Sequence, residues 1–118
     1  MNASRLELQA EPVESRAGQA ILVTATGEID STNVADFEAQ VRRAVGSSEA
    51  IIDLTGVAYF DSTGFAALDR MLAPGSPKLA VVIAEGSMIA RAAQLVSLRY
   101  YGSVDAARAS SPSQPTET

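Results

Sequence analysis

Two adjacent hydroxyl side chains, Ser62 and Thr63, follow Asp61 and precede a run whose apolar residues have the spacing of a helix. Either hydroxyl could accept a backbone N–H of the first helical turn and serve as the N-cap of that helix. The same position meets the positive end of the helix dipole, where an added anion is best tolerated. The pattern therefore predicts either a plain helix cap or a hydroxyl that can carry a phosphate.

Three further residues near these hydroxyls each allow a structural and a functional interpretation. Asp61 either bonds the backbone of the turn, as in an Asx-turn, or orients Ser62 or a partner's metal–nucleotide complex. Asp30 follows another predicted strand, and because parallel strands end at the same side of a sheet, it is expected near Ser62. Its carboxylate either stabilises the start of the next helix through the helix dipole or lines a partner-binding surface. Gly64 allows either a tight start of the helix or a close approach by a partner.

The residue types of the chain exclude most catalytic constellations. His and Cys are absent from all 118 residues, so Ser–His and Cys–His nucleophile pairs and ordinary zinc sites cannot be built. Lys78, the single Lys, follows Pro77 and has no evident path to a serine. Carboxylate chemistry alone stays open. We therefore expect no enzyme activity, no metal site and no cofactor bound by this chain.

Composition limits the partners and the compartment. The net charge of −5 argues against direct nucleic-acid binding, which depends on Lys and Arg at phosphates. Neither a membrane-spanning apolar run nor a signal-peptide pattern is present, so we expect no membrane insertion. The absence of Cys suits a cytoplasmic protein. With 47% hydrophobic residues the chain can bury a substantial core as one domain.

Strands and helices alternate along the chain, which predicts an α/β domain with right-handed β-α-β crossovers. The expected elements are strands at 6–10 and 20–26, a helix at 34–45, a strand at 50–54, a helix at 62–73, a strand at 79–84, a helix capped by Ser87, a short strand at 100–101 and a helical turn at 103–109 capped by Ser103. The first two strands favour a hairpin, and crossovers in one direction place the helices mainly on one face of a mixed sheet of four to five strands.

Several boundaries and core positions follow from the same pattern. Thr55-Gly56 is expected to end the third strand, and residues 110–118 lack apolar side chains and are predicted to be a disordered tail after a domain at 1–109. The residues expected to be buried are Leu54, Leu68 and Val82, and those expected to face inward on the third helix are Ile89, Ala92, Ala93 and Val96.

Two separated motifs resemble those of STAS-domain proteins, in particular the bacterial anti-sigma factor antagonists. One is residues 23–30, Val-Thr-Ala-Thr-Gly-Glu-Ile-Asp. The other has two parts, Ile-Asp-Leu-Thr-Gly-Val at 52–57 and Phe-Asp-Ser-Thr-Gly-Phe at 60–65. The resemblance covers roughly residues 6–108, with Phe65 in place of the family's usual Leu. It implies the open β-α fold of a single STAS domain.

The resemblance also implies a partner-switching function. Family antagonists are phosphorylated on the Ser that follows this Asp, here Ser62, with Thr63 as the alternative. The unphosphorylated protein would bind an anti-sigma factor that is also an ATP-dependent serine kinase, and so release a sigma factor. A metal-dependent serine phosphatase would reverse the modification, and ATP and Mg²⁺ would belong to the kinase. The expected partner-binding residues are Asp30, Asp61, Ser62, Thr63 and Gly64.

Two other functions stay open from the sequence. One is an accessory STAS subunit of a membrane lipid-transport ATPase complex, in which the same helix docks on a transporter. The other is a module that senses a small ligand or nucleotide. The retention of Ser62-Thr63 with Asp61 and Asp30 on either side favours the phosphorylation switch.

Overall fold

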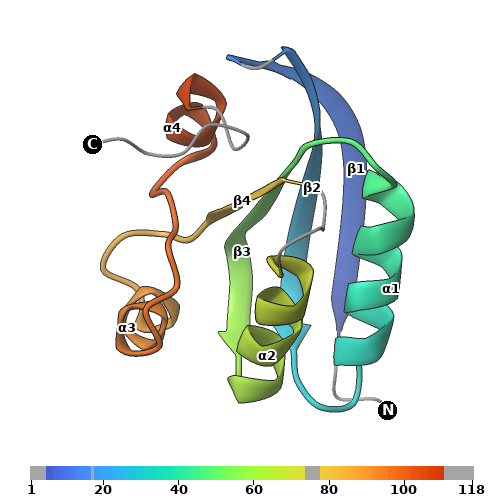
Figure 1. Cartoon of the computed structure of the whole chain (residues 1–118). Helices are drawn as coiled ribbons and strands as arrows, with labels where there is room; N and C mark the ends of the chain where they lie inside the picture. Colours follow the sequence, from blue (N-terminus) through green and yellow to red (C-terminus); the bar gives the residue numbers. More distant parts are fainter. Residues whose placement is uncertain (1–4, 17, 74–77, 111–118) are drawn as a thin grey trace.

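Four strands form one mixed sheet in the order β1-β2-β3-β4 (Figure 1). β1 (Leu6–Ser15) and β2 (Gly18–Ile29) form an antiparallel hairpin, while β3 (Ala50–Phe60) and β4 (Leu79–Val82) extend the sheet in parallel with β2. The computed structural model describes residues 5–16, 18–73 and 78–110. The predicted α/β fold with a mixed sheet is confirmed, although β1 and β2 are longer than expected.

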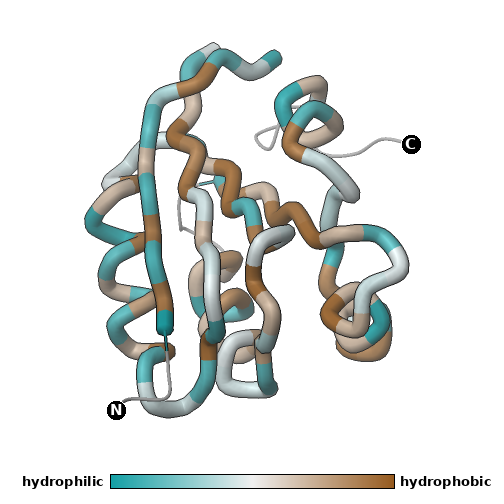
Figure 2. Tube along the Cα trace, turned by 180° about the vertical axis from the view of Figure 1, so that it is seen from behind, coloured by the Kyte–Doolittle hydropathy of each residue, from teal (hydrophilic) through white to brown (hydrophobic). Residues whose placement is uncertain are grey.

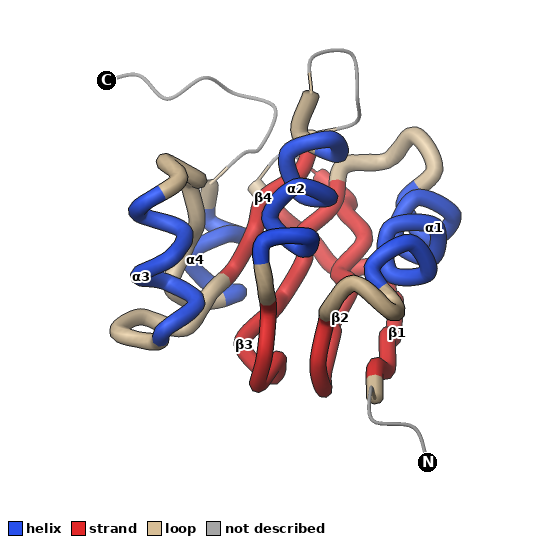
Figure 3. The backbone as a smooth tube through the Cα atoms, turned by 90° about the horizontal axis from the view of Figure 1, so that it is seen from below, coloured by secondary structure: helices blue, strands red, loops and turns tan. Residues whose placement is uncertain are grey.

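Four helices flank this sheet: α1 (Val34–Val45), α2 (Ser62–Met71), α3 (Met88–Leu95) and α4 (Val104–Ala109). Buried residues of α1, α2 and α3 join one core on the same face, and Figure 3 shows α1 and α2 side by side over the strands. α4 instead packs in a smaller cluster on the other face. The helices therefore lie mainly on one face, as predicted.

The strand sequences account for the two cores. Ile52 faces the large core and its neighbour Ile51 faces the α4 cluster, so β3 is apolar on both sides. β1 at the sheet edge alternates hydrophobic and hydrophilic residues, as Figure 2 shows along the long strand that starts near the N-terminus. Leu54 is 1% exposed and Leu68 is fully buried, so the predicted burial of the core is confirmed, as it is for Val82.

The prediction that Thr55-Gly56 ends the third strand is wrong. β3 continues to Phe60, because it stays paired with β2 through two register shifts. Gly56 pairs with Thr26, and a Cβ at Gly56 would lie 2.9 Å from the Thr26 methyl carbon. This glycine therefore permits close approach within the sheet and does not form a turn.

The C-terminal part differs from the predictions in two places. Tyr101 forms a single parallel bridge with Val82, donating its N–H to Val81 O at 2.8 Å, so residues 100–101 do not form a full fifth strand. Val96 is the C-cap of α3 and is 57% exposed, so the prediction that it faces inward is wrong. The Ser87 and Ser103 caps are confirmed by bonds from the N–H groups three residues on, at 3.0 and 3.1 Å. Residues 111–118 lie outside the described residues, so the disordered tail stays a prediction.

Candidate functional site

The sheet brings two Asp residues to neighbouring strand ends. Ile29 at the end of β2 pairs with Phe60 at the end of β3. Because these strands are parallel and in register here, Asp30 and Asp61 leave the sheet side by side at the same edge. The turn before α1 and the start of α2 are thereby brought together.

Asp61 is the N-cap of α2, so the prediction that Ser62 or Thr63 caps this helix is wrong. Asp61 has extended backbone (φ −104°, ψ −170°), and its Oδ1 accepts the N–H groups of Thr63 and Gly64 at 3.0 and 3.4 Å. The same oxygen accepts the Thr63 hydroxyl. A carboxylate serves better here than a hydroxyl because it also complements the helix dipole.

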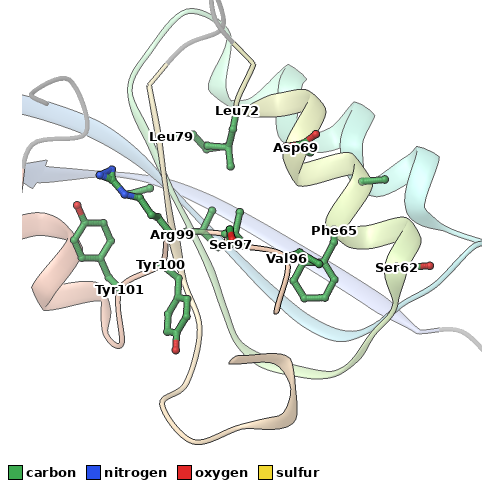
Figure 4. A pocket seen from close by; sticks show the side chains of 14 residues that line it. Ser62, Phe65, Asp69, Leu72, Leu79, Val96, Ser97, Arg99, Tyr100 and Tyr101 are labelled. Atoms are coloured by element: carbon green, nitrogen blue, oxygen red, sulfur yellow. The ribbon is translucent and has the colours of Figure 1, made fainter. Parts of the chain in front are cut away.

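Ser62 is consequently not needed to cap the helix. It is the first residue of α2, its side chain is exposed, and Figure 4 shows it pointing outward from the helix. Within the described part of the chain, its hydroxyl makes no hydrogen bond. Asp61 bonds the Thr63 hydroxyl and not that of Ser62, so an orienting role of Asp61 toward Ser62 is not seen in this structure.

Thr63 differs from Ser62 in both respects. Its side chain is half-buried and its hydroxyl is bonded to Asp61. The two adjacent hydroxyls therefore divide into one that belongs to the turn and one that is available at the surface.

Gly64 is buried beneath an aromatic ring. A Cβ at this position would lie 2.7 to 2.9 Å from three ring carbons of Phe60. The Phe60 ring in turn meets Phe65 edge-to-face, with 4.8 Å between ring centroids. Internal packing thus accounts for the glycine without a partner, and Phe65 supplies an aromatic contact that the family's usual Leu would not.

The turn that starts at Asp30 is braced in a similar way. The Asp30 carboxylate accepts the N–H of Thr32 at 2.9 Å and also its hydroxyl. The Asn33 side chain accepts the Asp30 N–H at 3.0 Å and donates to Glu28 O at 2.9 Å. Asn33 thus braces the end of β2, a role that the sequence pattern did not indicate.

A groove of about 1120 Å³ begins at Ser62 and runs along α2, between this helix and residues 96–101 (Figure 4). Its apolar lining includes Phe65, Leu72 and Val96, and its charged residues are Asp69 and Arg99. The sequence did not indicate this groove, because its far wall is an irregular segment placed by tertiary packing.

Ion pairs tie α2 to α1. Glu38 on α1 pairs with Arg70 on α2 at 2.8 Å and with Arg42 on its own helix at 2.7 Å. The hydrogen bond from Arg70 is the main cause that lowers the pKa of the Glu38 carboxyl. The helix that carries Ser62 is therefore fastened to its neighbour on the surface as well as in the core.

The described residues contain no group of three or more metal-ligating side chains that could hold an ion. They also contain no helix that is long and apolar enough to cross a membrane.

Comparison with known proteins identifies the family. A family model described as "Mlab, STAS domain" matches residues 13–102, and the chain therefore belongs to the STAS-domain family. No curated protein matches the chain significantly by sequence.

Solved structures agree on the fold. An anti-sigma factor antagonist from Mycobacterium paratuberculosis has a TM-score of 0.71 and 21% identity, over 87% of this chain and 91% of that chain. An uncharacterized protein with a SpoIIAA-like fold from Shewanella loihica PV-4 has a TM-score of 0.51 and 16% identity, over 91% of this chain and 94% of that chain. At these identities the likeness shows the fold alone.

Proposed function

We propose that this chain is an anti-sigma factor antagonist that is switched off by phosphorylation of Ser62. The observation that carries the proposal is the exposed, unbonded Ser62 hydroxyl on a helix that Asp61 already caps. A kinase can modify this hydroxyl without removing a bond that the described fold uses. Thr63 is the poorer acceptor, because its side chain is half-buried and its hydroxyl is bonded to Asp61.

Comparison of residues 61–63 with residues 53–55 supports a role for Ser62 beyond local structure. Asp53 accepts the N–H and hydroxyl of Thr55 in the same way that Asp61 accepts those of Thr63. The residue between Asp53 and Thr55 is Leu54, which is buried. The hydrogen-bond pattern therefore requires Asp and Thr but not a serine between them.

The negative charge of a phosphate on Ser62 is large enough to weaken partner binding strongly. Phosphate adds about −1.5 to −2 charges near neutral pH. At roughly 6 Å from the Asp61 carboxylate, with an effective dielectric constant between about 20 and 80, the repulsion is on the order of 1–5 kcal/mol. A similar penalty against acidic or packed groups of a partner would weaken binding by roughly tenfold to several thousandfold. The Asp61 cap stays in place, so no refolding is needed.

In this scheme the unphosphorylated chain binds an anti-sigma factor that is also a serine kinase, in the cytoplasm. The kinase supplies ATP and Mg²⁺, and a metal-dependent serine phosphatase restores the hydroxyl. Asp30, Asp61 and Thr63 form the surface around Ser62 that the partner covers, while Gly64 shapes it from below.

The experiment is an ATP-triggered release. Immobilised wild-type chain and Ser62→Ala are loaded with partner from native lysate, the partner is identified by mass spectrometry, and ATP with Mg²⁺ is then added. We expect the kinase to leave the wild-type chain quickly and to stay much longer on Ser62→Ala. The control Ser47→Ala, exposed at the other end of α1, behaves as wild type, and Thr63→Ala that binds the kinase also releases it on ATP. Release from both chains at the same rate, or phosphate on Thr63 alone, would contradict the proposal.

The groove along α2 favours one alternative function. The partly apolar groove along α2 suits docking on a transporter, as in an accessory subunit of a lipid-transport ATPase complex. In that case an ATPase complex would be captured and ATP would not release it in a Ser62-dependent way.

A further inference from the structure

The tripeptide Asp-Ser-Thr occurs twice in the chain, at residues 30–32 and 61–63, and nowhere else. Each copy follows a strand of the parallel pair, and the residues before them, Ile29 and Phe60, are register partners. Adjacent strands lie about 4.8 Å apart, so the two copies leave the sheet at one edge as close neighbours. A partner that covers one copy meets the other.

The two copies also share the bonds between their Asp and Thr residues. In each, the Asp Oδ1 accepts both the N–H and the hydroxyl of the Thr, with N–H bonds of 2.9 Å in the first copy and 3.0 Å in the second. In each, the Ser between them is exposed, and within the described residues its hydroxyl makes no hydrogen bond. Ser31 is therefore presented to solvent much as Ser62 is.

The bonding does not explain why Ser stands at position 31. At residues 53–55 the same bonds form around Leu54, so the pattern accepts an apolar residue in the middle. Ser31 is not the cap of α1 either, because Asn33 occupies that position. Its hydroxyl is thus free of any structural task among the described residues.

We infer that Ser31 is a second phosphate acceptor for the kinase that modifies Ser62, an inference that rests on the proposed function. In the step, Ser31 Oγ forms a bond to the γ-phosphorus of the kinase's Mg²⁺-bound ATP. The bond from that phosphorus to the β,γ-bridging oxygen breaks, ADP leaves, and the hydroxyl proton passes to a base of the kinase. The product carries two phosphates at one edge of the sheet.

The kinase phosphorylates the two serines in a fixed order and at different rates. Ser62 is the first residue of α2 and meets the N–H groups of the first turn, whereas Ser31 lies before the Asn33 cap and outside α1. Two phosphates at roughly 10 Å repel each other, which slows the second addition about tenfold at low salt. Ser62 is therefore modified first, and Ser31 responds to prolonged or strong kinase activity.

The test uses the full chain, tagged and purified from its own cells, in four forms: wild type, Ser31→Ala, Ser62→Ala and the double variant. Intact mass counts the phosphates, and trypsin places the two sites on separate peptides, residues 17–42 and 44–70. Ser47→Ala is a matched control, because Ser47 is exposed in the loop at the other end of α1 and follows no Asp. Thermal unfolding checks that every variant folds.

We expect up to two phosphates on the wild type and on Ser47→Ala, one on each single variant and none on the double variant. Phosphate confined to residues 44–70 of the wild type, with none on Ser62→Ala, would overturn the inference and leave the proposed function intact. Phosphate on residues 17–42 that persists in Ser31→Ala would also overturn it. No phosphate on any form would contradict the proposed function itself.

Discussion

The separation of cap and hydroxyl at the start of α2 can be tested by substituting Asp61 and Ser62 one at a time. Asp61→Ala removes the acceptor of the Thr63 and Gly64 N–H groups and of the Thr63 hydroxyl. Loss of an N-cap side chain costs about 0.5–2 kcal/mol, and the three lost contacts place the expected cost at the upper end, about 1.5–2 kcal/mol. Ser62→Ala removes an exposed side chain without a bond and should stay within about 0.5 kcal/mol of wild type.

The assay is urea unfolding near neutral pH, followed by circular dichroism and linear extrapolation. Asp61→Asn is the matched control, because Asn caps helices about as well as Asp but carries no charge, so its cost should be below about 1 kcal/mol. A loss of more than about 1 kcal/mol in Ser62→Ala, or of less than about 0.5 kcal/mol in Asp61→Ala, would show that the cap is not where the hydrogen bonds place it.

Three other substitutions test the surroundings of the site, and all are measured by the same denaturant unfolding. Gly64→Ala should cost about 1–3 kcal/mol, since the new Cβ would meet the Phe60 ring at 2.7 Å; a stabilised variant would mean that the ring moves freely. Leu68→Ala should cost about 2–5 kcal/mol because this side chain is fully buried in the core, and a cost below about 1 kcal/mol would contradict the packing of α2. Glu38→Gln should lose about 0.5–1 kcal/mol near neutral pH by breaking the pairs with Arg70 and Arg42. Because folding lowers the pKa of Glu38 below its usual 4.5, this contribution is present above pH 4.5 and disappears as the pH falls through the folded-state value, so the variant and wild type should converge there.

The start of α2 illustrates how far the sequence alone could lead. Apolar spacing placed the helix within two residues of both ends, because burial of Leu68 and its neighbours decides that pattern. The spacing could not identify the N-cap residue, because Asp, Ser and Thr are all good caps and Asp61, Ser62 and Thr63 are adjacent. That choice is made by the backbone of Asp61, which leaves β3 in an extended conformation.

Long-range packing explains the other differences. Glycine is common in turns, so Gly56 was expected to end the strand. Its place inside β3 depends instead on the close approach of Thr26 from the neighbouring strand. The groove beside α2 depends on where residues 96–101, which follow α3, run relative to α2. No pattern within a short window of sequence carries this information.

The three Asp-x-Thr segments, one inside β3 and two after strand ends, share the same side-chain hydrogen bonds. Asp and Thr bond each other and the backbone, so the local conformation is set without the middle residue. At residue 54 the middle position lies in the core and carries Leu. At residues 31 and 62 it lies beyond the carboxyl ends of β2 and β3 and carries an exposed Ser. Because these bonds do not involve the middle side chain, a charge can be added to either serine while the strand end and the helix start keep their bonds. Phosphorylation would therefore change what the surface repels and leave the fold as it is, which is what a reversible exchange of partners requires.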